Sequence, residues 1–132
     1  MGFLVLCGLA MAAQKPKPVP NLPGITAKDP FPNGCVSCHI VNPGGKDMRL
    51  GALLKASKHR NVDAIVKTVP NDCGKCHKAG TDKGLEKQFH KMHFGKKEKS
   101  LFVTEFGGQC LNCHTLDTAT GKMTVRSGAR NW

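Results

Sequence analysis

One pentapeptide, Cys-x-x-Cys-His, constrains this chain more than any other feature. It occurs three times, at 35–39, 73–77 and 110–114, so that successive histidines are 38 and then 37 positions apart. The pattern is typical of covalent c-type haem attachment, in which both thiols form thioethers with the porphyrin and the histidine binds the iron as proximal ligand. In a chain with 7 Cys and 6 His, chance supplies on the order of 0.01 to 0.02 copies. The sequence therefore predicts three haem c groups.

The residues of the three pentapeptides have two predicted roles. The attachment cysteines are Cys35, Cys38, Cys73, Cys76, Cys110 and Cys113, and the proximal iron ligands are His39, His77 and His114. Zinc ribbons fit poorly, because they use two Cys-x-x-Cys pairs per metal and do not need a histidine after each pair. A thioredoxin-like dithiol occurs once per domain, near a βαβ pattern that is missing here. Disulfides between such close cysteines would be strained.

The remaining histidines match the number of distal ligands that three irons need. They are His59, His90 and His93. The competing axial ligands are Met48, Met92 and Met123. Full bis-histidine ligation leaves no iron position for substrate chemistry, so the sequence predicts an electron carrier and not an enzyme. The spacing leaves open which distal histidine serves which iron.

Composition indicates one domain that depends on its cofactors. Only 39% of the residues are hydrophobic and 5% aromatic, which makes a poor apolar core at this length. Three porphyrins would supply the missing apolar surface, so folding and haem attachment should be coupled. We expect a mainly irregular fold with short α-helices, organised around three covalent haems.

The N-terminus indicates export. Residues 2–13 are apolar and end in Ala10-Met11-Ala12, a small-x-small cleavage pattern. The run is too short to span a bilayer, and Leu6 disfavours lipidation of Cys7. We expect a signal peptide over 1–13, a proline-rich arm over 14–34 that wraps the first haem, and a three-haem domain over 35–132. Cleavage would place the protein in the periplasm or another extracytoplasmic space.

Apolar spacing predicts short helices between the haem motifs. The expected helices cover 47–59, 62–69 and 81–93, with Asp47 as the first N-cap. Each haem motif should form a helical turn, and 123–125 should be extended, but no alternating strand pattern is evident. His90 and His93 are three residues apart and so share one helix face. One helix could therefore supply distal ligands to two haems.

At the level of family, the chain resembles small multihaem cytochromes c of the class III kind, or the haem domain of multihaem flavocytochrome reductases. The segment Phe89-His90-Lys91-Met92-His93-Phe94 followed by the motif at 110–114 is similar to a His-x-x-His arrangement in the latter. The resemblance covers about 35–115. It differs in having three motifs where four are common, and in lacking a histidine upstream of Cys35.

The charge balance bears on partners. The chain has 20 Lys and Arg against 9 Asp and Glu, a net charge of +11. Export, the predicted haems and the shortage of aromatic residues argue against nucleic-acid binding. The expected partners are redox proteins with acidic docking faces, including other cytochrome or flavoprotein subunits of a larger reductase assembly. Peripheral association with an anionic membrane is the remaining option.

The first prediction concerns covalent composition. The mass of the mature protein should equal a chain cleaved near Ala12 or Ala13 plus three haem groups, because each thiol pair attaches one porphyrin. Intact-mass spectrometry measures both properties at once. Fewer than three haem additions, retention of Met1, or a lipid on Cys7 would contradict it.

Overall fold

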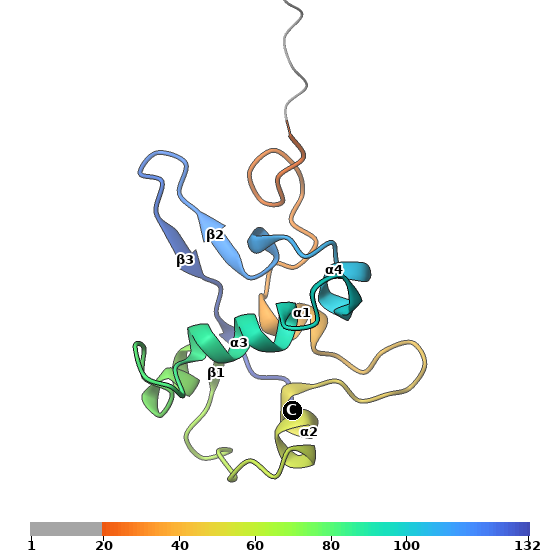
Figure 1. Ribbon diagram of the computed structural model, residues 1–132, viewed down its shortest axis with the longest axis vertical. Coiled ribbons are helices and arrows are strands. Elements are labelled where there is room, and N and C mark those ends of the chain that lie inside the picture. Colours follow the sequence, from red (N-terminus) through yellow and green to blue (C-terminus); the bar gives the residue numbers. More distant parts are fainter. Residues whose placement is uncertain (1–19) are drawn as a thin grey trace, which may run out of the picture.

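The computed structural model describes residues 20–132, so the predicted signal peptide and the first part of the arm lie outside it. The α-helices are α1 (Cys35–Cys38), α2 (Leu50–Ala56), α3 (Leu85–Phe94) and α4 (Leu101–Thr104). The 3-10 helices are η1 (Asn71–Lys75), η2 (Lys97–Lys99) and η3 (Cys110–Asn112). The strands are β1 (Thr68–Val69), β2 (His114–Leu116), β3 (Met123–Val125) and β4 (Gly128–Ala129). Figure 1 shows these short elements joined by long irregular segments.

All three Cys-x-x-Cys-His motifs form a helical turn, as predicted. They coincide with α1, η1 and η3. In the first two motifs the histidine N–H donates to the carbonyl of the first cysteine, at 2.9 Å in α1 and 3.0 Å after η1. Residues i and i+3 of such a turn lie on the same side. The turn therefore presents both thiols of a motif together.

The helices between the motifs are shorter than the sequence predicted. Helix α2 begins at Leu50, because the Asp47 carboxylate accepts a hydrogen bond from the Arg49 N–H at 3.0 Å and does not cap the helix. Helix α3 begins at Leu85, after a turn closed by a hydrogen bond from Gly84 N–H to the Thr81 carbonyl at 3.0 Å. Both helices nevertheless occupy the expected stretches, and 81–93 contributes the longest helix of the described chain.

The predicted helix over 62–69 is wrong. A single turn forms, with Val66 N–H donating to the Val62 carbonyl, and the chain then extends into β1. The carboxylate of Asp72 accepts hydrogen bonds from the N–H groups of Lys67 and Thr68, both at 2.8 Å. Those two donors are therefore unavailable to a helix, and apolar spacing could not reveal this competing acceptor.

The strands form two small antiparallel pairs. Strand β2 pairs with β3, and β1 pairs with β4. The extended segment 123–125 was predicted, but its partner and the β1–β4 pair were not, because two- and three-residue strands carry no alternating pattern. Strands β3 and β4 both follow the third motif. Strand β3 pairs with β2, which begins at His114 of the third motif, and β4 pairs with β1, which lies just before the second motif.

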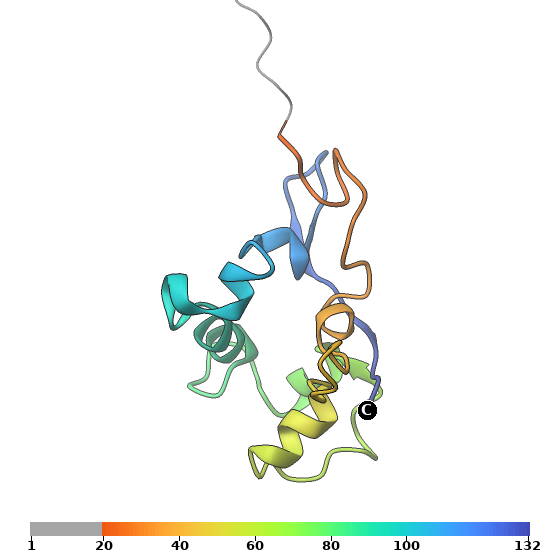
Figure 2. The same cartoon turned by 90° about the vertical axis from the view of Figure 1, so that its right-hand side faces the viewer.

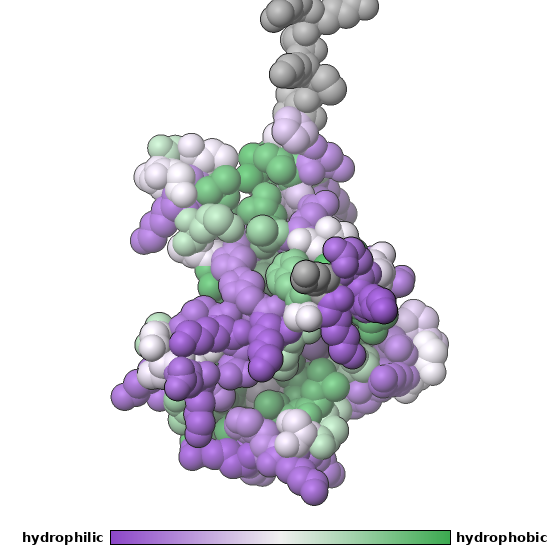
Figure 3. Space-filling model, viewed as in Figure 1, coloured by the Kyte–Doolittle hydropathy of each residue, from purple (hydrophilic) through white to green (hydrophobic). Residues whose placement is uncertain are grey.

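The elements surround the middle of the molecule. Helix α3 crosses the centre in Figure 1, with α2 below it and the β2–β3 hairpin above. Turned by 90°, α3 and α4 lie on one side while α1 and α2 lie on the other (Figure 2). The space-filling view shows hydrophilic side chains gathered over α3, with hydrophobic ones above and below them (Figure 3). The haem motifs and α3 are thus grouped around one central region.

Very little apolar side-chain area is buried. Among the described residues only Val66 and Val69 form a hydrophobic core, at 3% and 1% exposure, while Ser100 and Asn112 are buried polar residues. Ordering each residue costs roughly 1–2 kcal/mol of backbone entropy. Two buried valines cannot offset that cost over 113 residues. The fold needs a further source of stabilisation.

We predict that the chain does not fold once its motif cysteines are removed. Replacing the six motif cysteines by alanine should abolish the cooperative unfolding transition, because the remaining apolar core is too small. Far-UV circular dichroism during a denaturant titration measures this. A steep transition in the six-alanine variant would show that the polypeptide folds on its own.

Candidate functional site

The six histidines of the chain lie in three separate pairs. Each pair joins a motif histidine to one of the three others: His39 with His93, His77 with His59, and His114 with His90. The ring centroids are 6.1, 6.0 and 6.2 Å apart in that order. We call these the first, second and third pairs, after the order of the motifs. The sequence left this assignment open.

The ring separation suits an iron ion between the two imidazoles. A metal–imidazole nitrogen bond is about 2 Å long, so a bridged pair has its ring centres about 6 Å apart once each ring's radius of about 1 Å is added. The facing rings differ in orientation, with interplanar angles of 83° in the first pair, 25° in the second and 6° in the third. The geometry therefore fits bis-histidine ligation at three places.

Backbone carbonyls fix the tautomer of the two histidines on α3. The Nδ1 of His90 bonds the Glu86 carbonyl at 2.7 Å, and the Nδ1 of His93 bonds the Phe89 carbonyl at 2.8 Å. A carbonyl oxygen can only accept, so Nδ1 of each neutral ring carries the proton. Nε2 then keeps its lone pair, which is the form that binds a metal.

Three further histidines follow the same rule with different carbonyls. The acceptors are Met48 O for His39 at 2.9 Å, Lys83 O for His77 at 2.7 Å and Arg60 O for His59 at 2.8 Å. Burial is also the main cause that lowers the pKa of His39. Burial therefore favours the neutral form of that ring, which is the form that binds a metal.

Helix α3 connects the first and third pairs. His90 and His93 come from its last two turns, and three residues of helix rise by about 4.5 Å. The Phe102 ring of α4 packs edge-on against His93, with centroids 5.2 Å apart. Ser100 donates its hydroxyl to the His93 carbonyl. His90 and His93 thus face the histidines of two different motifs from one helix.

Four of the six motif thiols are in environments that raise their pKa. Burial is the largest cause that raises the pKa of Cys35 and of Cys38 to about 11, and the nearby Cys113 contributes to both. Burial also raises the pKa of Cys73 and Cys113. A reactive dithiol needs the opposite shift. All six motif thiols are free of disulfides, and the first and third motifs lie close together.

Two of the three methionines that were candidate axial ligands are exposed. Met92 is 62% exposed and Met123 is 49% exposed. Met92 lies between His90 and His93 in sequence, and a helix turns by about 100° per residue, so it projects from a different face. Met48 contributes its backbone carbonyl to His39. Each motif histidine instead faces another histidine.

Arg126 is a site residue that the sequence analysis missed. Its N–H donates to the Cys113 carbonyl at 2.9 Å and its Nε donates to the His114 carbonyl at 3.1 Å. Its guanidinium also pairs with Asp29, with the two side chains only 10% and 15% exposed. Gly34, just before the first motif, has φ +58 and lies so close that a Cβ there would be 2.9 Å from Arg126 Cβ. Arg126 therefore joins the arm to two motifs.

The described part of the arm packs near the third motif. Asp29 pairs with Arg126, and Phe31 makes an edge contact with Phe106, at a centroid distance of 5.8 Å. The arm was predicted to wrap the first haem. Its contacts to residues around the third motif modify that prediction, since no sequence signal specified the position of Arg126 or Phe106.

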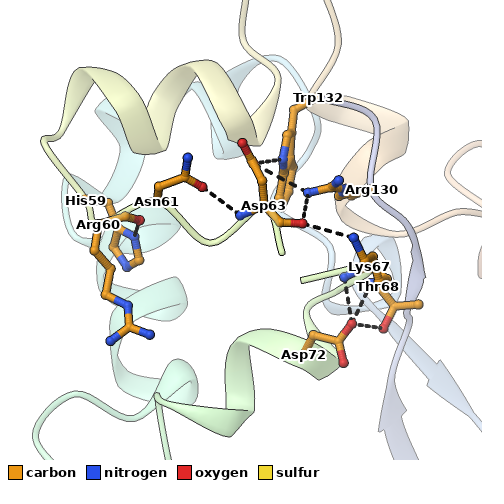
Figure 4. Close-up of polar contacts among 9 residues, drawn as sticks. All are labelled: His59, Arg60, Asn61, Asp63, Lys67, Thr68, Asp72, Arg130 and Trp132. Carbon is orange, nitrogen blue, oxygen red and sulfur yellow. Dashed lines mark hydrogen bonds and ion pairs between the residues drawn. The ribbon is translucent and has the colours of Figure 1, made fainter. Parts of the chain in front are cut away.

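The last residues of the chain reach the first motif and α2. Asn131 donates from Nδ2 to the His39 carbonyl at 2.9 Å, while its buried Oδ1 has no partner among the described residues. Trp132 packs against Gly51 of α2 and donates from Nε1 to Asp63 at 2.7 Å (Figure 4). The sequence suggested that Trp132 contacts a haem or a partner subunit. Within the described residues, its contacts hold the last residues of the chain against α2 and Asp63.

Comparison with protein-family models, curated proteins and solved structures found no match. Within residues 20–132, no three His, Cys, Asp or Glu side chains gather into a single metal-binding group. The same range contains no helix that is both long and apolar enough to cross a membrane. The argument for function therefore depends on the paired histidines and the motifs beside them.

We predict that Arg126→Leu lowers the free energy of unfolding by about 3–5 kcal/mol, because it leaves the largely buried Asp29 carboxylate unpaired. Chemical denaturation of the purified full-length protein measures the change. Arg49→Leu is the matched control, since the Arg49–Asp47 pair is 42% and 36% exposed, and solvent screening should leave it with a much smaller effect on stability. Equal losses in the two variants would contradict the role given to Arg126.

Proposed function

We propose that the protein transfers electrons through three covalently attached haem c groups, each held between two histidines. The observation that carries this proposal is the pairing of each motif histidine with one other histidine at 6.0–6.2 Å. In this assignment, the first haem is held by His39 and His93. The second is held by His77 and His59, and the third by His114 and His90.

The protein's own groups define the properties of such centres. Two imidazoles would hold each haem iron, and carbonyl partners keep Nε2 available for a metal in five of the six histidines: His39, His59, His77, His90 and His93. Methionine ligation raises haem potentials relative to histidine ligation, so these centres should work at low potential. When bound, the haem iron supplies one-electron redox chemistry. The chain would supply position and ligation.

The arrangement favours electron exchange among the three centres. The pKa of Cys35 is raised partly by Cys113 and Cys73, so one cysteine from each of the other motifs lies close enough to influence it. Helix α3 also carries a ligand for each of two centres. A carrier that holds its centres this close can accept an electron at one and deliver it from another.

The charge around α3 supports an acidic redox partner. Residues 83–99 contain six lysines and two glutamates, a net +4 in 17 of the 132 residues. Lys87 and Lys91 on α3 are exposed, as are Met92 and Leu101, at 62% and 66%. A basic surface with exposed apolar side chains, on the helix that holds two of the haems, suits transient docking to an acidic protein. The exposed apolar pair would equally suit a small electron-delivering subunit of a larger assembly.

The functional prediction assigns each distal histidine to one haem. His59→Ala, His90→Ala and His93→Ala should each convert a single haem from low-spin to high-spin, because each substitution removes one axial ligand. Electron paramagnetic resonance distinguishes the centres. The nearly perpendicular rings of the first pair should give a strongly anisotropic low-spin signal, and the more parallel rings of the others should give ordinary rhombic signals.

His93→Ala should therefore remove the strongly anisotropic signal, and the other two variants should leave it intact. Met92→Ala is the matched control on the same helix, because its side chain is exposed and faces away from the histidine pair. Loss of the anisotropic signal in His90→Ala, or unchanged low-spin iron in any histidine variant, would refute the assignment.

A further inference from the structure

The distal histidine of the second pair sits at the end of α2 in a Schellman motif. The Lys58 N–H donates to the Lys55 carbonyl at 3.0 Å, and the His59 N–H donates to the Leu54 carbonyl at 2.9 Å. Lys58 has φ 56, in the left-handed region. These two hydrogen bonds and this conformation define the motif. They place the His59 ring where its Nδ1 meets the Arg60 carbonyl (Figure 4).

Lys58 is strained in this position. Glycine or asparagine normally occupies the left-handed residue of the motif, because a Cβ is unfavourable there. Within residues 20–132, Lys58 is the only non-glycine residue with positive φ, and the seven others are all glycines. Strain of this kind at a ligand position suggests a functional reason. If His59 leaves its partner, the turn can open and Lys58 can adopt an ordinary conformation.

For the other two distal histidines, leaving the partner would relieve no backbone strain of this kind. His90 and His93 lie in the ten-residue helix α3, and each bonds the carbonyl four residues earlier. Moving either ring away from its partner would require the helix to shift. That shift would also disturb the other histidine pair to which α3 contributes. The second pair is therefore the one in which a distal ligand can leave at least cost.

A cavity of about 660 Å³ lies beside His59, between α2, the 59–63 segment and Trp132. No residue of the three haem motifs lines it. Both lining carboxylates have cationic partners, since Asp47 pairs with Arg49 and Asp63 pairs with Arg130. The lining also includes Lys55 and Arg60, which make no ion pair within the described residues. The cavity thus favours a small anion.

We propose that His59 is an exchangeable ligand, and that a small anion entering from this cavity can take its place on the haem held by His77. This rests on the proposed function. In the exchange, the anion donates a lone pair to the iron as the bond from His59 Nε2 breaks. His59 keeps its own lone pair, and no electron is transferred. The other two haems keep both histidines.

Cyanide added to the oxidised protein tests the proposal, with the shift of the Soret band as the readout. Saturation should correspond to one cyanide per three haems. Lys58→Asn, which relieves strain, should weaken cyanide binding about threefold to tenfold, and Lys58→Val, which increases strain, should strengthen it by a similar factor. Lys122→Asn removes the same charge from an exposed residue far along the sequence and should change nothing.

His59→Ala separates strain at Lys58 from a general effect on the haem. This variant has no distal ligand to displace, so it should bind cyanide tightly whether residue 58 is Lys or Asn. Three results would each overturn the proposal. They are cyanide binding at two or three haems alike, no cyanide binding at all, and equal affinities in Lys58→Asn and Lys122→Asn. Intact mass and spin state are measured on every sample. If three low-spin haems are present but none exchanges its ligand selectively, only this inference is rejected. If haems are missing, the proposed function itself is rejected.

Discussion

Each motif imidazole faces one other imidazole, with about 6 Å between the ring centroids. The rest of the structure depends on this constraint. The chain buries two valines as its apolar core among the described residues, so side-chain packing alone cannot hold its segments in place. The three pairs each join segments distant in sequence, such as His39 with His93. A group bound between two rings would act as a crosslink, and three crosslinks would organise the central region.

The segment after the third motif supplies the polypeptide part of that organisation. Its β3 strand pairs beside His114, and Arg126 contacts the backbone of the third motif and packs against Gly34 before the first. Strand β4 pairs with β1 just ahead of the second motif, and Asn131 bonds the His39 carbonyl. One segment therefore touches all three attachment regions. This explains how a chain with so little core can hold three local turns in a defined arrangement.

The sequence predicted the features that are encoded locally. Each motif is a helical turn, α3 carries two histidines on one face, and 123–125 is extended. The helix over 62–69 was wrong, because the acceptor that prevents it, Asp72, follows the segment and has no periodic signature. The histidine pairing and the role of Arg126 were also unpredictable, since both depend on contacts between segments far apart in the chain.

The three distal histidines of the proposed assignment are supported in two physically different ways. Two lie on one helix, and the third lies on a turn after another helix. His90 and His93 share α3, so any movement of that helix affects the first and third centres together. His59 lies on a strained turn whose backbone bonds reach no further than Leu54. A change there acts on the second centre alone. In the proposed assignment, α3 would couple the first and third centres and the second could change its ligand independently, while Trp132 and Asp63 hold the adjoining segment against α2.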